Sequence, residues 1–149
     1  MSLSRSDLVP GAELAPVTKA LSQATIQCYA QASGDFNPIH VDEAFAAQTP
    51  FGGTIAHGML VMAYVSEMLT AAFGRAWLET GRLKVRFRAP ARPGDVITAR
   101  GSVELLRQED GRCKVFCTVE CCNQAGEVLV SGDAQVDLEV VGKDIWHPG

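Results

Sequence analysis

The chain has 149 residues, enough for a sizeable core, and no repeat or linker divides it, so we expect one domain over residues 1–149. A composition of 47% hydrophobic and 20% charged residues excludes a disordered chain. The net charge of −4 argues against a general nucleic-acid binder, whose surface would be basic. No apolar run is long enough to cross a bilayer. We therefore expect neither a nucleic acid nor a membrane as partner.

The five cysteines form no CxxC pair, and Cys113, Cys117 and Cys121 recur on one face of an alternating segment. Free cysteine in such a pattern behaves as a small apolar residue. The first residues, MSLSRSDLVPG, lack the apolar core of a signal peptide. These features predict reduced thiols, no zinc site and a cytoplasmic location.

The first part of the chain predicts one strand followed by helices. Residues 14–19 are a candidate strand. Ser22 is a good N-cap for a helix over residues 23–32, and the following glycine would end it. Asp42 can cap a short helix over residues 43–48, which proline and a glycine pair then stop.

Residues 57–73, HGMLVMAYVSEMLTAAF, predict a longer helix that is apolar nearly all round and is broken mainly by Ser66 and Glu67. A helix that is apolar on every side is surrounded by protein. Other elements must therefore wrap around it.

After Gly74 the hydrophobic period changes from that of a helix to that of strands. The expected strands cover residues 82–89, 97–105, 112–121 and 128–138, with turns between them. Each has one apolar face, which predicts an antiparallel meander with one side on a core. We therefore predict an α+β fold in which a curved antiparallel sheet wraps around the long central helix, the arrangement called a hot dog fold. The edge strands would be long, and pairing two sheets edge to edge predicts a homodimer.

The segment SGDFNPIH, residues 33–40, brings together residues that suit proton transfer near neutral pH, Asp35 and His40. Pro38 fixes one backbone angle and disfavours a helical Asn37, so the loop is stiff, and Asn37 could orient a water. The same residue types are common in turns. On this segment alone, a corner between helices and a proton-transfer site are equally good interpretations.

A second segment, GGTIAHGML, residues 52–60, opens the apolar helix. A helix N-terminus offers unpaired N–H groups and a partial positive charge. Without a side chain, Gly58 would let an acyl group approach its N–H, which predicts an oxyanion site for a thioester carbonyl. Close helix–sheet packing is the alternative for Gly58, and for His57 we favour a satisfied, half-buried histidine. His40 and His57 lack further ligands, so we expect no metal.

Four basic residues alternate along one predicted strand: Arg82, Lys84, Arg86 and Arg88. They could attract the phosphates of coenzyme A or an acidic carrier protein. A solvated strand face is the commoner explanation of such a stripe. Arg86, near the following turn, is the candidate to test.

Together, YAQASGDFNPIHVD and FGGTIAHGML resemble the hydratase-2 motif of MaoC-like (R)-specific enoyl-CoA hydratases and dehydratases, and VRFRAPARPGD extends the resemblance over most of the chain. The resemblance implies a hot dog dimer with sites near the subunit interface. It implies that Asp35 and His40 act as the acid–base pair on water and that the Gly58 N–H lies in the oxyanion hole. Further residues that we expect to contact the substrate are Ser33, Asn37, His57 and Arg86.

The implied reaction is the reversible addition of water to a trans-2-enoyl thioester, which gives an (R)-3-hydroxyacyl thioester. It needs no metal, nicotinamide or flavin cofactor, because coenzyme A or an acyl carrier pantetheine is part of the substrate. We expect a homodimer or a higher homo-oligomer. Two alternatives stay open. One is an acyl-CoA thioesterase, since the hot dog fold also hosts hydrolases. The other is a non-catalytic acyl-thioester binder or the structural half of a heterodimer.

Overall fold

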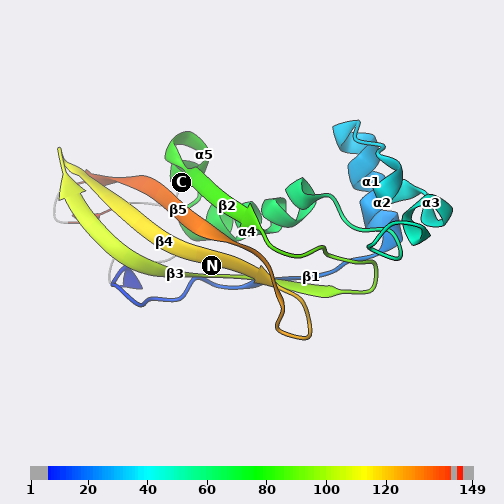
Figure 1. Cartoon of the computed structure of the whole chain (residues 1–149). Helices are drawn as coiled ribbons and strands as arrows, with labels where there is room; N and C mark the ends of the chain where they lie inside the picture. The colour runs from blue at the N-terminus through cyan, green and yellow to red at the C-terminus, as the bar shows by residue number, and fades with distance from the viewer. Residues whose placement is uncertain (1–6, 142–143, 146–149) are drawn as a thin grey trace.

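The computed structural model describes residues 7–141 and 144–145 (Figure 1). Its helices are α1 (Gln23–Ser33), α2 (Pro38–Val41), α3 (Glu43–Ala47), α4 (Gly58–Phe73) and α5 (Arg75–Thr80). Its strands are β1 (Val17–Ala20), β2 (Arg82–Phe87), β3 (Val96–Glu109), β4 (Arg112–Cys122), β5 (Val128–Val141) and β6 (Asp144–Ile145).

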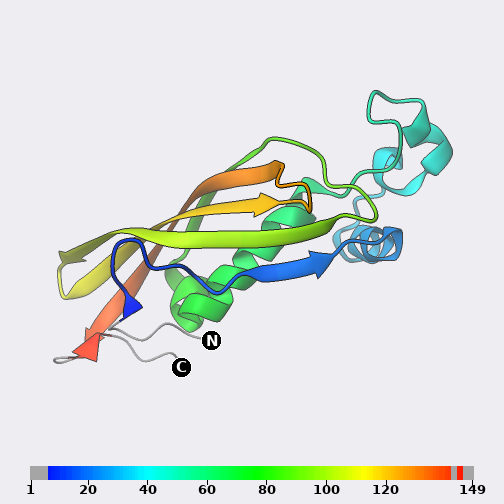
Figure 2. The ribbon, with the colours of Figure 1, turned by 90° about the horizontal axis from the view of Figure 1, so that it is seen from below.

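One antiparallel sheet in the order β1-β3-β4-β5-β2 bends along α4, and β6 pairs with β5 (Figures 1 and 2). Helix α4 contacts β1, β3, β4 and β5. Its buried side chains are Leu60, Val61, Tyr64, Val65, Met68, Leu69, Ala72 and Phe73. The inner face of β4 supplies alternate buried residues: Cys113, Val115, Cys117, Val119 and Cys121. A curved sheet around an apolar central helix is the predicted hot dog arrangement, which is confirmed.

Local capping places the first helices where the sequence predicts them. The Ser22 hydroxyl accepts a hydrogen bond from the Thr25 N–H at 3.1 Å and begins α1. Gly34 ends that helix with a φ of 77°, a left-handed conformation that favours glycine. Asp42 Oδ1 accepts from the Phe45 N–H at 3.0 Å and begins α3.

A meander predicts that β2 pairs with β3, the next strand in the chain, and this prediction is wrong. Strands β3, β4 and β5 follow one another, but β2 pairs with β5, with Val85 opposite Gly132. The outer strands of the main sheet, β1 and β2, have only four and six residues. The expectation of long edge strands is therefore also wrong. It no longer supports the prediction of a homodimer.

Two short helices were not predicted. Helix α2 begins within SGDFNPIH, where we expected a loop, and α5 follows Gly74, in a segment before the expected strand for which no element was predicted. Helix α5 packs back on α4, because the buried Trp77 donates its indole N–H to the Ser66 hydroxyl at 3.2 Å. Neither helix is longer than six residues, too short for a period to show.

Helices α1, α2 and α3 lie together beyond one end of the sheet (Figures 1 and 2). We call residues 23–57 the helical lobe and the sheet with α4 and α5 the body. No helix among residues 7–141 and 144–145 is long and apolar enough to span a membrane. Cys28 is exposed on α1, and the other four cysteines are buried in the body. The cytoplasmic location stays a prediction.

Candidate active site

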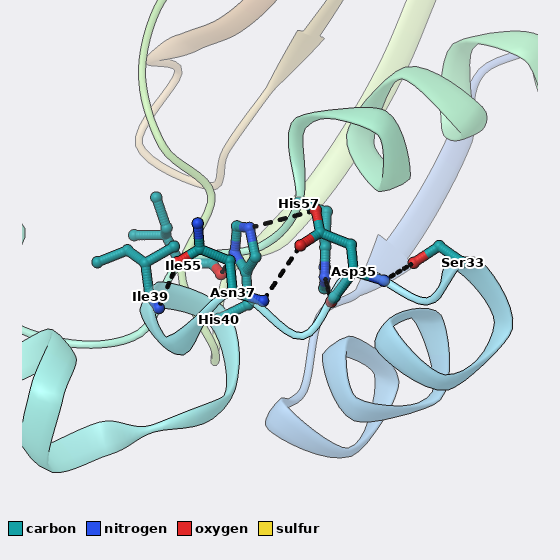
Figure 3. A network of polar contacts seen from close by, with 7 residues as sticks. All are labelled: Ser33, Asp35, Asn37, Ile39, His40, Ile55 and His57. Carbon is teal, nitrogen blue, oxygen red and sulfur yellow. Dashed lines mark hydrogen bonds and ion pairs between the residues drawn. The ribbon is translucent and has the colours of Figure 1, made fainter.

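The segment SGDFNPIH folds as a chain of side-chain-to-backbone hydrogen bonds (Figure 3). The Asp35 N–H donates to the Ser33 hydroxyl at 3.2 Å, and the Asn37 N–H donates to Asp35 Oδ1 at 3.1 Å. Asn37 Oδ1 accepts from the Ile39 N–H at 3.1 Å and caps α2, with Pro38 as the first helical residue. Ser33 and Asn37 thus have defined local roles in shaping the corner between helices.

His40 projects from α2 toward Asp35. Its Nδ1 lies 2.8 Å from the Ile55 carbonyl oxygen. A carbonyl only accepts, so Nδ1 carries the hydrogen and a neutral ring leaves a lone pair on Nε2. That Nε2 lies 4.0 Å from Asp35 Oδ2. This gap is too long for a direct hydrogen bond, and a single water can contact both atoms. The two side chains differ in exposure, 12% for His40 and 53% for Asp35.

A second set of hydrogen bonds fixes the helix that carries His40. The Gln23 amide donates to the His40 carbonyl at 2.9 Å, and the Thr54 hydroxyl donates to Gln23 Oε1 at 2.7 Å. The Ile55 N–H also donates to the Ile39 carbonyl at 3.2 Å. Thr54 is buried. Sequence reasoning missed Gln23 and Thr54, because neither belongs to a charge or metal-ligand pattern.

His57 is only 2% exposed. Its Nε2 lies 2.9 Å from the Asp35 carbonyl oxygen, and its Nδ1 is buried without a hydrogen-bond partner among the residues that the structure describes. The ring stacks on His40 with centroids 3.9 Å apart and contacts the Tyr29 ring at 4.7 Å. The interpretation of His57 as half-buried and satisfied is therefore wrong on both counts.

The ligand-type atoms of Asp35, His40 and His57 all lie within 4.8 Å of one another. The expectation of no metal rested on the lack of a further ligand beside the two histidines, and Asp35 lies close enough to be one. Nevertheless, nitrogen ligands sit at about 2.0–2.1 Å from zinc, and the two rings are stacked with only 26° between their planes. Rings in that arrangement must turn before both can aim a lone pair at one ion. That the site needs no metal stays a prediction.

Gly58 is the first residue of α4, so its N–H has no partner within the helix. A Cβ at this position would lie 2.9 Å from Cε1 of the Phe87 ring. This contact supports the alternative explanation, in which glycine allows close packing of the helix on β2. Gly58 begins a 16-residue helix directly after His57, and its N–H stays a candidate oxyanion donor.

Arg86 is not brought together with the other candidate residues. Side chains alternate along a strand, and its neighbour Phe87 faces Gly58, so Arg86 points to the opposite side of β2. There it lines a surface hollow with Lys84 and Arg88. All three side chains are exposed, as a solvated strand face would be.

Known proteins are similar to this chain in sequence and in fold. The family model described as "MaoC like domain" matches residues 7–124. The chain belongs to the MaoC-like domain family. A 3-hydroxybutyryl-CoA dehydratase of Methylorubrum extorquens is 36% identical over 124 residues, which cover 80% of this chain and 74% of the relative. An (R)-specific enoyl-CoA hydratase of Rhodospirillum rubrum is 36% identical over 129 residues, which cover 86% and 87%.

Among solved structures, the (R)-hydratase from A. caviae involved in PHA biosynthesis superposes with a TM-score of 0.75 at 32% identity. The superposition covers 87% of this chain and 96% of that one. The family and fold predicted from the sequence are thus confirmed.

Proposed function

We propose that this MaoC-like protein is a hydro-lyase that adds water reversibly to trans-2-enoyl thioesters and forms (R)-3-hydroxyacyl thioesters. The relatives at 36% identity are named as a dehydratase and a hydratase, which supports this reaction class. The observation that carries the proposal is the 4.0 Å gap between Asp35 Oδ2 and His40 Nε2 beside the N-terminus of α4.

Nε2 of His40 and Oδ2 of Asp35 are both acceptors when His40 is neutral and Asp35 is ionised. A water between them therefore donates one hydrogen to each, and its remaining lone pairs point away from the pair. This arrangement orients the water oxygen toward C3 of an enoyl chain. As the oxygen bonds to C3, one water proton passes to the pair and the electrons of the double bond move toward the thioester carbonyl. The pair then protonates C2 on the same face, which completes the addition.

The carbonyl oxygen gains negative charge when the double-bond electrons move. The N-terminus of α4 carries a partial positive charge, and the Gly58 N–H has no helical partner. We assign this N–H the role of oxyanion donor, because a fixed donor beside developing charge stabilises the transition state.

The substrate is proposed to be an acyl-CoA or an acyl carrier protein thioester, with pantetheine as part of the substrate and no separate cofactor. Three apolar side chains beside the site are more than half exposed in the single chain: Phe36 at 57%, Met59 at 54% and Phe87 at 55%. Such a surface suits an acyl chain and a second subunit. We therefore propose a homodimer, or a higher homo-oligomer, with the site near the interface.

The test follows the loss of enoyl-thioester absorbance with crotonyl-CoA. Asp35→Asn and His40→Ala should each lower kcat by about 10²–10⁴-fold, because each removes one partner of the water. Asp42→Asn is the matched control, since Asn still caps α3 and Asp42 does not face the gap. Chiral analysis of the product should give the (R) isomer.

Two results would contradict the proposal. Release of free thiol with the acyl group hydrolysed would indicate a thioesterase, because hydration leaves the thioester intact. Binding of longer, branched and carrier-bound enoyl thioesters without turnover would indicate a non-catalytic binding protein.

A further inference from the structure

His57 is buried beside both Asp35 and His40 and directly precedes Gly58 (Figure 3). Its ring donates to the main chain of Asp35 and stacks on the ring of His40. Its own carbonyl accepts from the N–H groups of Leu60 and Val61 in the first turn of α4, the helix that begins at Gly58. A side chain that is 98% buried does not contact a substrate that enters from solvent. Its influence on the site must therefore pass through its neighbours.

The hydrogen-bond partner fixes the tautomer of His57. Because the Asp35 carbonyl only accepts, Nε2 carries the hydrogen, and Nδ1 keeps a bare lone pair. That lone pair is buried and has no hydrogen-bond partner among the described residues. Leaving a buried polar atom unsatisfied is unfavourable by about 1–3 kcal/mol. A phenylalanine would fill the same space without that penalty, so packing alone does not account for a histidine here.

The ring Nε2–H of His57 holds the segment around Asp35, which makes few other hydrogen bonds to distant residues. Residues 33–38 are all exposed. The other hydrogen bonds described for Asp35 are local, from its own N–H to Ser33 and from the Asn37 N–H to its carboxylate. The bond from His57 ties Asp35 to the start of α4 instead. It thereby fixes the carboxylate relative to His40 and to the Gly58 N–H at the same time.

We propose that His57 is a positioning residue, which sets the gap between Asp35 and His40 through the hydrogen bond from its Nε2 to the Asp35 main chain. This inference rests on the proposed hydration reaction and assigns His57 a role other than substrate contact. A shared water requires that both acceptors lie at hydrogen-bond distance from one oxygen. A displacement of about 1 Å at such a site lowers the rate by about 10²-fold.

Three variants separate the hydrogen bond from the packing of the ring. His57→Phe keeps an aromatic ring against His40 and removes the donor. His57→Gln removes the ring and keeps an N–H donor at a similar distance from the backbone. Tyr29→Leu is the control, because it removes a ring that contacts His57 at 4.7 Å and leaves the bond to Asp35 in place. Urea unfolding of each variant verifies that it is folded.

Kinetics on crotonyl-CoA are the first readout. We expect His57→Phe to lower kcat by about 10²-fold and to change KM by less than about threefold, because substrate binding is untouched. His57→Gln should retain at least about a tenth of the wild-type kcat, and Tyr29→Leu nearly all of it. The inference is overturned if folded His57→Phe keeps the wild-type kcat, or if His57→Gln is as slow as His57→Phe.

Nitrogen-15 NMR of the histidine rings is the second readout and needs no activity. In the wild type, His57 should be the Nε2–H tautomer with an unprotonated Nδ1, whereas His40 should carry its hydrogen on Nδ1. A hydrogen on Nδ1 of His57 would overturn the inference even if His57→Phe failed to fold. A wild-type protein without hydratase activity would instead refute the proposed function, and the tautomer would still decide the hydrogen bond.

Discussion

The body and the helical lobe are held together by different interactions. In the body, α4 buries apolar side chains in each of its turns, and long ladders of backbone hydrogen bonds join β3, β4 and β5. In the lobe, α1, α2 and α3 bury only Ile26, Ala30 and Ala46. Side-chain-to-backbone hydrogen bonds hold it in place instead, from Gln23 to helix α2 and from His57 to the loop at Asp35.

This difference separates folding from function within one chain. Apolar burial in the body is distributed over many contacts and supplies stability. The lobe has few contacts, but they decide where Asp35 and His40 lie. A loss of stability in the body should therefore leave the geometry of the site intact in molecules that stay folded. A loss of one hydrogen bond in the lobe should affect the rate more than the stability.

The largest effect on stability is expected for Phe73→Ala. Phe73 is fully buried on α4, and removing such a ring from a core typically costs about 3–5 kcal/mol. Phe45→Ala is the matched control in the lobe, since Phe45 is 49% exposed and its loss should change stability by less than about 0.5 kcal/mol. Urea unfolding measures both. Equal losses would show that the two regions do not differ as described.

The same contrast explains what the sequence could predict. The alternation of β3, β4 and β5 is a local pattern, and the structure follows it. The apolar character of α4 predicted a helix enclosed on every side, which is wrong for the single chain, because Met59, Ala63, Glu67 and Ala71 form an exposed stripe. The pairing of β2 with β5 is a long-range choice that no local period encodes. A four-residue helix such as α2 leaves no period at all, although its cap Asn37 and first residue Pro38 are helix-start residues that could have indicated it.

In the site, the segment SGDFNPIH alone left a turn and a proton-transfer site equally good, and the resemblance to the hydratase-2 motif implied that Asp35 and His40 act as a pair. The structure places their side chains opposite each other. The contact of His57 with Asp35 and His40 was not predictable, because it depends on the path that residues 52–57 take between α3 and α4. The same holds for the Gln23–Thr54 hydrogen bond, which joins residues 31 positions apart. The sequence thus pointed to the two side chains that face each other and gave no sign of the Gln23–Thr54 hydrogen bond beside them.

A smaller effect is expected for Asn37→Ala, which removes the cap of α2. Ser22→Ala removes the cap of α1 and is the matched control. Each should lower stability by about 0.5–2 kcal/mol. Only Asn37→Ala should also lower kcat on crotonyl-CoA, because α2 carries His40. Asn37→Asp should restore most of the rate, since Asp caps a helix as well as Asn does.

An equal fall in kcat for Ser22→Ala and Asn37→Ala would contradict this comparison. It would mean that the lobe responds as one unit to any loss of stability. Unchanged kcat in both, with the expected loss of stability, would mean that the position of His40 does not depend on its cap.

The smallest perturbation is thiol labelling, which compares the two regions without a mutation. Only a thiolate reacts, and burial raises the pKa of Cys117 and of Cys121 to about 12. At pH 8 these thiols are protonated and enclosed, so they should react only when the body opens. Cys28 is exposed on α1 and should react at once without loss of activity. Native protein should therefore show one fast thiol, and denatured protein five. Labelling of the body cysteines should accelerate in Phe73→Ala and stay slow in Asn37→Ala, because only the first change weakens the contacts that enclose them.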